Sequence, residues 1–438
     1  MKVTISQETL MEALKRGAFA ALSDEAQSDT STLSLLIKSV KIKVEKDEIT
    51  FESATALVAS RYVEPITDKI AVKETGIVMV PAKDLYDWVN RQGDCMICLL
   101  FKELDSPEMI NVVTGEADIA SKASIKKTGT LGLASRDANK TGSKWSLDSF
   151  DSAQVPLIDY DLKSKPLFLL PLEQLNDGLK NISFVAMPKD SDHLFDTISF
   201  QHKDNKMYIV TTDCARCAVW HMPNADKITM EETFTAAEIE ENGMSGAWKR
   251  NLLVPAKLLG EICKLSSNAA PLAFYRDEAK NRIYISQPGF MVRLATAEKD
   301  MVEKYPPLDL FLVKQYKDLC AVPRSILANR LNTVSLVNKN AILFAFSSDQ
   351  LTLEGVSESG HSPCKANVSV PKLSEDFKRV WNVKHILDVL KVLEDDDIKI
   401  LVPKDKDKDS IKILSPSQPN VSYYAMAVER SKYNLDED

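Results

Sequence analysis

Two pairs of cysteines are the clearest candidates for chemistry in this sequence. Of the seven cysteines, Cys95 and Cys98 form one Cys-x-x-Cys pair, and Cys214 and Cys217 form another. Two such pairs can supply the four thiolates of a structural zinc site. However, Cys95 and Cys98 belong to the apolar run Cys-Met-Ile-Cys-Leu-Leu-Phe, which is typical of a buried strand, where residues three apart point to opposite faces. Neither pair has the glycine-rich turn that usually presents zinc ligands. We therefore expect reduced thiols, no bound metal and no cofactor.

Other residues that could perform catalysis are scattered along the chain. The five histidines show no HExxH or HxH spacing, and the sequence has no Walker loop, no GxGxxG motif after a strand and no GxSxG elbow. The acidic run at 394–397 follows a predicted helix at a turn, where solvated carboxylates are usual. We therefore expect a protein that is not an enzyme. The alternative is a Mg²⁺-dependent nuclease or polymerase accessory protein that uses such acidic clusters, which chelator sensitivity and turnover would reveal. The histidines are His193, His202, His221, His361 and His385.

Length and charge restrict the class of protein further. A chain of 438 residues is long enough for about three domains, and a hydrophobic content of 44% is sufficient for packed cores. No run of about 18 apolar residues is present, and the first residues alternate as a strand without a signal segment, so we expect a cytoplasmic protein with no membrane span. The net charge of −8 argues against simple electrostatic adhesion to nucleic acid.

Internal repetition is the strongest signal in the sequence. Two amphipathic helical patterns each occur three times, and proline stands at or near the first turn of most copies, where its missing N–H costs nothing. In one copy Leu258, Leu259 and Ile262 share a helix face. Helices of about a dozen residues must pack against other elements to be stable. The first pattern spans residues 5–17, 170–183 and 322–335, and the second spans 80–92, 254–266 and 381–393.

Alternating apolar and polar residues between these helices predict antiparallel strands joined by Asp, Asn, Lys and Gly turns. The fold class is therefore α+β, with three repeats of a domain that has two helices on an antiparallel sheet. The clearest strand runs are 40–44, 206–210, 282–286, 342–346 and 409–414.

Proline- and aspartate-rich connectors near 156–166 and 305–314 divide the repeats. Two stretches, 124–143 and 225–246, have the composition of surface insertions, and 434–438 forms an acidic tail. The expected domains are residues 1–163, 164–313 and 314–438.

With these repeats in place, the sequence resembles the beta subunit of bacterial DNA polymerase III, the sliding clamp, over essentially its whole length. Segment 211–222, Thr-Thr-Asp-Cys-Ala-Arg-Cys-Ala-Val-Trp-His-Met, is similar to the family's Thr-Asp-Gly-His-Arg-Leu-Ala segment. Segment 382–390, Asn-Val-Lys-His-Ile-Leu-Asp-Val-Leu, is similar to its Asn-Val-x-Tyr-Leu-x-Asp-Val-Leu helix. Segment 302–307, Val-Glu-Lys-Tyr-Pro-Pro, stands where the family has a Gly-x-Phe-Pro-Asp connector.

The resemblance implies three clamp domains per chain and a homodimer that closes head to tail into a ring. Helices would line the hole and a continuous sheet would form the outside. Such a ring encircles double-stranded DNA without sequence preference and acts as a processivity factor for DNA polymerase, and a clamp loader places it there. The six helix windows contain eleven Lys or Arg and eight Asp or Glu, so the remainder of the chain carries −11. A ring needs little direct affinity, because topology holds it on DNA.

The basic residues of these helices are the candidates for the DNA-facing surface, and the alternative interpretation is that they lie on ordinary solvated helix faces. The implied DNA-facing residues are the eleven in these windows, Lys15, Arg16, Lys83, Arg91, Lys180, Lys257, Lys264, Arg324, Arg330, Lys384 and Lys391, together with Lys189, which lies outside them.

The resemblance also implies a groove between the second and third domains that binds the short hydrophobic motifs of polymerase and clamp loader. The sequence departs from the family here, because Cys214-Ala215 replaces Gly-His, Cys217 replaces Leu, and Glu429 replaces a thioether near the end of the chain. These departures leave the partner motif open. By position, the groove residues are Phe195, Thr212, Arg216, Cys217, Pro306, Leu310, Phe311, Ala427, Val428, Glu429 and Arg430.

A dimer joint is implied at Trp145 and Leu147 of one copy against Leu336 and Val337 of the other. Alternation places Trp145 and Leu147 on one face of an edge strand, and we expect both to form a small exposed apolar patch in a monomer. The alternative is that they belong to the core of their own domain.

Overall fold

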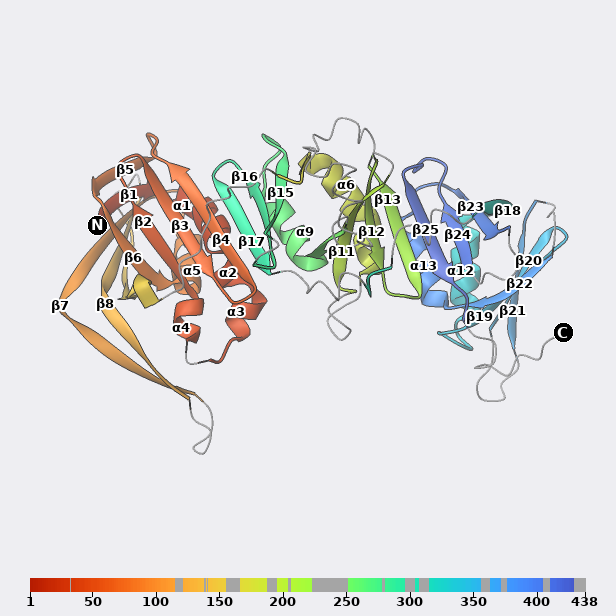
Figure 1. The fold of residues 1–438 in the computed structure, drawn as a ribbon, viewed down its shortest axis with the longest axis horizontal. Helices are drawn as coiled ribbons and strands as arrows, with labels where there is room; N and C mark the ends of the chain where they lie inside the picture. The colour runs from red at the N-terminus through yellow and green to blue at the C-terminus, as the bar shows by residue number, and fades with distance from the viewer. Residues whose placement is uncertain are drawn as a thin grey trace, which may run out of the picture. The chain divides into compact units, whose positions relative to one another are not determined.

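The computed structural model divides the chain into two compact units, Met1–Leu172 with Ile262–Thr296, and Glu173–Glu261 with Ala297–Asp438 (Figure 1). The structure describes residues 1–31, 33–114, 121–137, 139, 141–154, 166–186, 195–203, 206–222, 251–277, 280–295, 304–306, 315–355, 363–371, 376–404 and 410–428.

All six predicted helices are confirmed, since each window contains one helix. Among the described residues, no helix is long and apolar enough to cross a membrane. The six are α1 Gln7–Gly17, α5 Ala82–Asn90, α6 Leu172–Ile182, α9 Ala256–Leu265, α12 Arg324–Val334 and α13 Val383–Val392. Three shorter helices, α2 Phe19–Leu22, α3 Asp24–Ser28 and α4 Ser34–Ile37, follow α1, and 3-10 turns occupy Ser152–Gln154 and Ser183–Val185.

Local sequence explains where α1 begins and which face it buries. The Ser6 hydroxyl accepts a hydrogen bond from the Thr9 N–H, which satisfies a donor that the helix itself leaves unpaired. Leu10 and Leu14 lie four residues apart and are both fully buried. Because residues at this spacing share one helix face, α1 packs its apolar side on the sheet.

The first unit contains two antiparallel sheets. One has five strands in the order β5-β1-β7-β8-β9, so β9 lies at an edge, and the other has eight strands in the order β10-β15-β16-β17-β4-β3-β2-β6. Helices α1 and α5 pack between them in one core. The strands are β1 Lys2–Ser6, β2 Ser39–Val44, β3 Glu48–Ala54, β4 Val58–Pro65, β5 Ile70–Glu74, β6 Gly76–Pro81, β7 Met96–Thr114, β8 Ser121–Arg136, β9 Lys144–Phe150, β10 Phe168–Leu170, β15 Leu272–Asp277, β16 Arg282–Gln287 and β17 Phe290–Ala295.

The second unit repeats this plan. Its eight-stranded sheet has the order β14-β11-β12-β13-β25-β24-β23-β18, and its four-stranded sheet has the order β21-β20-β19-β22. The strands are β11 Thr197–Lys203, β12 Lys206–Thr212, β13 Arg216–His221, β14 Asn251–Pro255, β18 Tyr316–Pro323, β19 Ile342–Ser347, β20 Gln350–Gly355, β21 Cys364–Ser369, β22 Phe377–Trp381, β23 Asp397–Pro403, β24 Ser410–Leu414 and β25 Val421–Met426. The α+β class and its antiparallel sheets are therefore confirmed.

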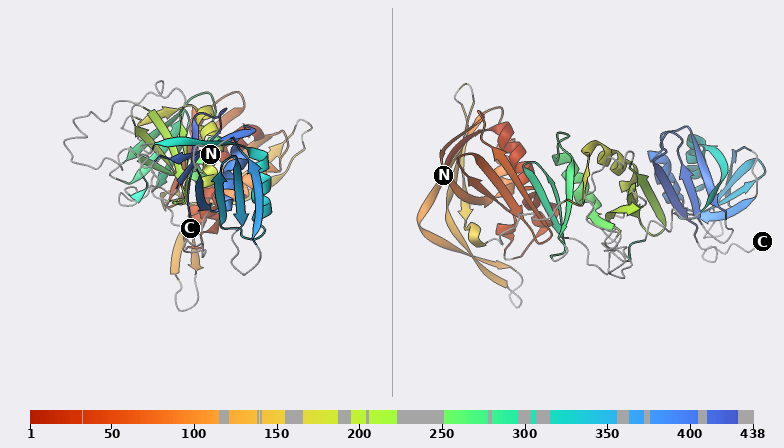
Figure 2. Two further views of the ribbon diagram at one scale, coloured as in Figure 1. Left: turned by 90° about the vertical axis from the view of Figure 1, so that its right-hand side faces the viewer. Right: turned by 45° about the horizontal axis from the view of Figure 1, so that its top comes forward.

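The interpretation of 124–143 as a surface insertion was wrong. Residues up to Arg136 belong to β8, which pairs with β7 along a long hairpin, and this hairpin continues past the other strands as an arm (Figure 1 and Figure 2). Ile125, Leu131 and Leu133 are buried. Lys126, Thr130 and Gly132, which contributed to the loop-like composition, alternate with these buried residues along the strand. The second suggested insertion, 225–246, lies outside the described residues.

The same rule of strand pairing appears twice in the chain. In each repeat, at least four described strands lie between the two long helices, and three described strands follow the second helix. The last strand of the second repeat, β17, pairs with β4, the third strand after α1. The last strand of the third repeat, β25, pairs with β13, the third strand after α6. By the same rule β9, the last strand of the first repeat, would pair with β21, the third strand after α12. In the described part of the chain these two strands lie at the edges of different sheets and do not pair with each other.

Candidate functional sites

The turn between β12 and β13 carries most of the polar residues of the predicted groove. Its geometry comes from Asp213, whose carboxylate accepts hydrogen bonds from the N–H groups of Ala215 and Arg216 at 3.1 and 2.8 Å. The Thr212 hydroxyl donates to the Arg216 carbonyl at 2.8 Å. Cys214 takes a left-handed φ of 68°, a conformation that favours glycine. The tight turn therefore explains why the similar family has glycine at this position.

Arg216 is the centre of a buried ion-pair network. Its Nε atom lies 2.8 Å from Asp213 Oδ2, and its Nη1 atom lies 3.0 Å from Asp388 Oδ2 on α13. Its guanidinium carbon lies 5.6 Å from the centre of the Phe184 ring. The Arg216 side chain is only 10% exposed. Arg216, which was predicted to line the groove, thus links the turn to α13. Its positive charge is already paired with Asp213 and Asp388 of the same chain.

Burial and the charges of this network shift the pKa values of two groups on α13, Asp388 and His385. Burial raises the pKa of Asp388, but hydrogen bonds and charge from Lys391 and Arg216 outweigh burial and lower it overall. Burial also lowers the pKa of His385, and the charges of Arg216 and Lys384 act in the same direction, whereas Asp213 and Asp388 oppose them. The folded protein therefore favours a charged Asp388 and a neutral His385.

An apolar cluster lies beside the turn. Cys217 and Tyr305 are buried in it, and Phe195 is partly buried against them. The Phe195 and Tyr305 rings have centroids 6.4 Å apart, and the Tyr305 hydroxyl donates to the Val210 carbonyl at 3.1 Å. Burial raises the pKa of both Cys217 and Tyr305 well above the usual values. The cluster is therefore a buried apolar core beside the turn, and Phe195 is one of its partly exposed members.

The end of the described chain meets a different surface. The Val428 N–H donates to the Val380 carbonyl of β22 at 2.8 Å, and its side chain packs with Ala341, Leu343 and Val380. Ala427 precedes it and is partly buried. Val428 therefore contacts the four-stranded sheet and is not part of the cluster around Cys217.

The structure thus brings some of the predicted groove residues together and leaves others apart. Thr212, Arg216, Cys217 and Phe195 converge, and Pro306 follows the buried Tyr305. The predictions for Leu310, Phe311, Glu429 and Arg430 fall outside the described residues.

Sequence reasoning missed four residues of this site. The Asp-x-x-Arg spacing in the turn gave a usable signal for Asp213. Distance along the chain concealed Asp388, Tyr305 and Phe184.

The predicted DNA-facing residues divide into two groups. Arg16 and Arg324 are engaged in structural contacts: Arg16 donates to the Leu265 carbonyl and to the Tyr62 hydroxyl at 2.9 and 3.2 Å. Arg324 donates to the carbonyls of Asp395 and Leu390 at 2.8 and 3.3 Å. Lys189 lies outside the described residues. The exposed set is Lys83, Arg91, Lys180, Lys257, Lys264, Arg330, Lys384 and Lys391, and Lys15 is partly exposed beside Glu12.

The acidic run at 394–397 has structural roles in the fold. The Asp395 carboxylate accepts hydrogen bonds from the Ser415 hydroxyl and, at 2.7 Å, from the Ser417 N–H. The Asp396 carbonyl accepts from the Arg324 N–H at 2.7 Å. Within the described part of the chain, no group of three or more His, Cys, Asp or Glu residues is placed to hold a metal ion.

The strand prediction for the first cysteine pair is confirmed for one member. Cys98 lies within β7, whereas Cys95 directly precedes it. Cys217 is buried in β13, and Cys214 is exposed in the turn.

The expectation for the joint residues on β9 was half wrong. Trp145 is 43% exposed, but Leu147 is only 4% exposed and belongs to the core around α1 and α5. The two residues do share a strand face, but β8 and the core cover Leu147 while Trp145 lies nearer the strand end. In the second unit Leu336 is 83% exposed just beyond α12, and Val337 is half-buried against Gly355. Of the four predicted joint residues, Trp145 and Leu336 are therefore the two that expose enough apolar surface to contact a second chain.

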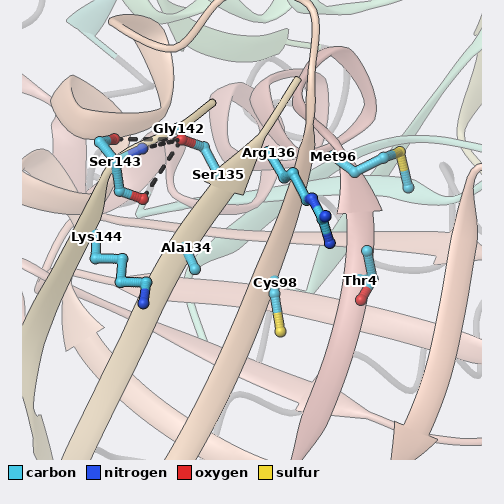
Figure 3. A pocket seen from close by; sticks show the side chains of 9 residues that line it. All are labelled: Thr4, Met96, Cys98, Ala134, Ser135, Arg136, Gly142, Ser143 and Lys144. Carbon is cyan, nitrogen blue, oxygen red and sulfur yellow. Dashed lines mark hydrogen bonds between the residues drawn. The ribbon is translucent and has the colours of Figure 1, made fainter. Parts of the chain in front are cut away.

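A hollow of about 500 Å³ lies on the outer face of the five-stranded sheet, opposite the core. Thr4, Cys98, Ala134 and Lys144 lie in one row across β1, β7, β8 and β9, as their pairing requires (Figure 3). The first three side chains are short, which creates the hollow. Longer side chains, including Arg136, rise around it.

Comparison with known proteins agrees with this architecture. No family model matches the chain. It is 22% identical to the beta sliding clamp of Synechocystis sp. over 338 residues, which cover 75% of this chain and 76% of that protein. A solved structure of the DNA polymerase III subunit beta from Pseudomonas aeruginosa superimposes with a TM-score of 0.72 at 16% identity, covering 98% of this chain and 100% of that chain. The Caulobacter crescentus pol III beta gives a TM-score of 0.71 at 15% identity over 98% and 100% of the two chains.

These matches define the class of fold: the chain has the fold of the bacterial sliding clamps along nearly its whole length. The resemblance seen in the sequence to the DNA polymerase III beta subunit is confirmed.

Proposed function

We propose that this protein is a DNA sliding clamp, a non-catalytic ring of two chains that encircles duplex DNA and tethers a polymerase to it. The observation that carries the proposal is the repeated rule of strand pairing. Because β17 joins β4 and β25 joins β13, the rule needs one more join between β9 and β21. Both strands lie at sheet edges, where unpaired N–H and C=O groups can pair with another chain. In a head-to-tail homodimer, β9 of each copy pairs with β21 of the other, so two such joins close the ring.

The charge distribution of the helices supports DNA as the occupant of this ring. Two long helices per repeat pack on the sheets, and their exposed side chains include Lys83, Lys257, Lys264 and Arg330. Arg16 and Arg324 contribute charge but are held by contacts within the chain. A few exposed cations are sufficient, because a closed ring stays on DNA by topology and tolerates salt that dissociates phosphate contacts.

Retention on circular DNA tests the proposal directly. The protein is first loaded onto nicked circular duplex DNA, either by a cognate clamp loader or by dissociating the dimer and letting it reassociate around the DNA. The protein should then remain bound in 0.5 M salt and should be lost when the circle is linearised, with EDTA making no difference after loading. A protein held by several phosphate contacts would instead lose on the order of 10³-fold affinity between 50 and 200 mM salt. Retention on linear DNA in high salt would contradict encirclement.

A peptide-binding groove beside Cys217 and Arg216 is the proposed attachment site for polymerase and clamp loader. It is supported by the apolar cluster beside the turn, in which Cys217 and Tyr305 are buried and Phe195 is partly exposed. A Pseudomonas aeruginosa clamp has been solved bound to griselimycin. A Caulobacter crescentus clamp has been solved with a polyethylene glycol at its putative beta-motif tethering region. Small pockets with apolar anchors suit short extended peptides.

Substitution of Phe195 tests this groove. We expect a motif peptide from the cognate polymerase to bind with micromolar affinity, about −8 kcal/mol. Phe195→Ala should weaken peptide binding by about 2 kcal/mol or more. Because Phe195 also packs on the buried cluster, the melting temperature is measured in parallel, with Val428→Ala, which loses packing on the four-stranded sheet, as the control. A lower melting temperature with unchanged peptide affinity would contradict the assignment of Phe195 to the groove.

A further inference from the structure

The eight-stranded sheet of the second unit has an outer face that exposes apolar side chains. The Tyr423 hydroxyl donates to the Asn181 carbonyl of α6 at 3.0 Å, so Tyr423 lies on the helix side of β25. Because side chains alternate along a strand, Tyr424 and Met426 lie on the opposite side, the outer face. Tyr424 packs there in the same cluster as Cys217, and Met426 is 37% exposed. The outer face therefore adjoins the proposed groove and leaves apolar surface exposed in the described part of the chain.

Lys412 is a positioned cation on this face. It lies on β24 and pairs with Tyr424 across the two strands. Its Nζ atom lies 5.9 Å from the centre of the Tyr316 ring and 5.5 Å from the centre of the Tyr424 ring. Contacts of this kind with two aromatic rings hold an ammonium group in place. Burial lowers the pKa of Lys412, and no described residue accepts a hydrogen bond from its ammonium or forms an ion pair with it.

A carboxylate on the same face is already engaged elsewhere. Asp318 pairs with Leu401, and Leu401 pairs with Lys412, so Asp318 lies two strands away from Lys412. The Asp318 carboxylate lies 3.8 Å from the Nζ atom of Lys399. A half-buried ammonium gains most from a carboxylate, because hydrogen bonds between two charged groups are stronger than neutral ones. A partner can supply the carboxylate that the described chain does not.

Lys412 lies at a defined distance from the apolar part of the proposed groove. Cys217 pairs with Tyr424, and Tyr424 pairs with Lys412, so the three residues form one row across β13, β25 and β24. Two strand spacings, roughly 10 Å, separate the ends of this row. In an extended peptide every second side chain points to the same side, at intervals of roughly 7 Å. The length of an aspartate or glutamate side chain covers the remaining distance.

We propose that Lys412 selects an acidic side chain in the partner's peptide, two residues from the apolar side chain that lies beside Phe195 and Cys217. This inference rests on the proposed groove and specifies the chemistry of the peptide that it binds. A single cation between aromatic rings suits one carboxylate. A nucleic-acid backbone would need several free cations, and Lys399 on this face is already paired with Asp318.

Peptide selection tests this inference without a known partner. A display library of random short peptides is selected on the full chain and on its Lys412→Met variant, which keeps the packing on the two tyrosines but removes the charge. Peptides enriched on the unchanged protein should carry Asp or Glu two residues from a large apolar residue, and those enriched on Lys412→Met should not. Lys399→Met is the matched control, because Lys399 lies on the same face but is paired within the chain. It should enrich the same acidic peptides as the unchanged protein.

Synthetic peptides measure the size of the effect. An enriched peptide is made with an amidated end, once with the acidic residue and once with the corresponding amide, and fluorescence anisotropy gives each dissociation constant. Replacing the acid by the amide should weaken binding about tenfold. Lys412→Met should weaken binding of the acidic peptide about tenfold and should change binding of the amide peptide by about twofold or less. Lys412→Arg should restore most of the affinity for the acidic peptide, because it keeps the charge.

The outcomes separate this inference from the proposed function. Acidic and amide peptides of equal affinity, or enriched peptides without an acid, would overturn the role of Lys412 and leave the groove intact. Phe195→Ala should weaken both peptides, and peptides that it does not affect would bind elsewhere and contradict the groove as well. If no peptide is enriched, the groove and the role of Lys412 both fail, whereas retention on nicked circles still reports on the ring. An effect of Lys412→Met confined to binding of single-stranded oligothymidylate would assign Lys412 to nucleic acid and overturn the inference.

Discussion

The turn at 212–217 and the edge strand β9 carry the two sites that the resemblance implies, and they differ in how their polar groups are satisfied. At the turn, Arg216 is paired on both sides by Asp213 and Asp388 and is nearly buried. At the edge, Lys144 and Trp145 are exposed, and one side of the strand has no described partner.

This difference separates a preformed site from an incomplete one. The buried ion pairs fix the turn to α13 before any ligand arrives, so a peptide would meet a rigid surface and lose little to ordering it. An open strand edge instead gains backbone hydrogen bonds only when a second chain arrives. Substitutions at the turn should therefore act on folding, and substitutions at the edge should act on assembly.

Breaking the ion-pair network should produce the largest effect. Arg216→Ala leaves Asp213 and Asp388 without their shared cation in a mostly buried place, so the free energy of unfolding should fall by about 3 kcal/mol or more. Urea denaturation followed by tryptophan fluorescence measures this loss. Lys391 also pairs with Asp388 but is 72% exposed, so Lys391→Ala is the control and should change the free energy by about 0.5 kcal/mol or less. Equal losses for the two variants would contradict a preformed turn.

The two apolar residues on β9 should respond in opposite ways. Leu147→Ala removes a buried side chain from the core and should lower the free energy of unfolding by about 2–3 kcal/mol. Trp145→Ala should change the folding of a single chain much less, because Trp145 is 43% exposed. It should instead shift the dimer towards monomers in sedimentation experiments, as should Leu336→Asp.

Met109→Asp is the matched control, because Met109 is 56% exposed on the hairpin arm, away from β9. A Trp145→Ala variant that stays dimeric at concentrations where Leu336→Asp is monomeric would remove Trp145 from the joint.

The sequence predicted the repeating elements well because their signals are local. The 3.6-residue periodicity of α9 and α13, and the alternation of β16, β19 and β24, are written in consecutive residues. The prediction at β8 was wrong for a reason that is also local. Lys126 and Thr130 alternate with its apolar residues, and this polar composition concealed the buried Ile125, Leu131 and Leu133 on the other face.

The candidate sites were predicted less completely because they depend on contacts between distant segments. Alternation placed Trp145 and Leu147 on the same face, but which of them the core covers depends on β8 and on α1. Arg216 was singled out by resemblance, yet its engagement with Asp388 joins residues that lie 172 positions apart. No pattern within one sequence reports such a pairing.

Acidification should weaken the turn in two separate steps. The pKa of His385 is lower in the folded chain than its usual 6.5, so the unfolded chain binds the proton more readily and stability falls as the pH drops below about 6.5. The pKa of Asp388 is also lowered from 3.8, so its contribution is present above that pH and is lost as the pH falls through the folded value. Urea unfolding between pH 7.5 and 3 measures both steps.

Single variants assign the steps. His385→Gln should flatten the profile between pH 7.5 and 5, and Asp388→Asn should flatten the part below pH 4. The edge strand offers a contrast, because no histidine lies on β9, and Lys144→Ala should leave the shape of the profile unchanged. A profile that His385→Gln does not alter would show that this residue is not held neutral by the network.

The smallest effect is expected from relieving strain at Cys214. A non-glycine residue with φ of 68° costs about 1 kcal/mol relative to glycine. Glycine also gives the unfolded chain more freedom, which offsets part of the gain. Cys214→Gly should therefore raise the free energy of unfolding by about 0.5 kcal/mol, measured by urea denaturation under reducing conditions. Ala215→Gly is the control at the next position, where φ is not positive, and it should lower stability because only the entropic effect remains. Because Asp213 and Arg216 already fix the turn, the Cys214→Gly variant should bind a motif peptide with unchanged affinity. A weaker affinity would mean that the Cys214 side chain itself contacts the peptide.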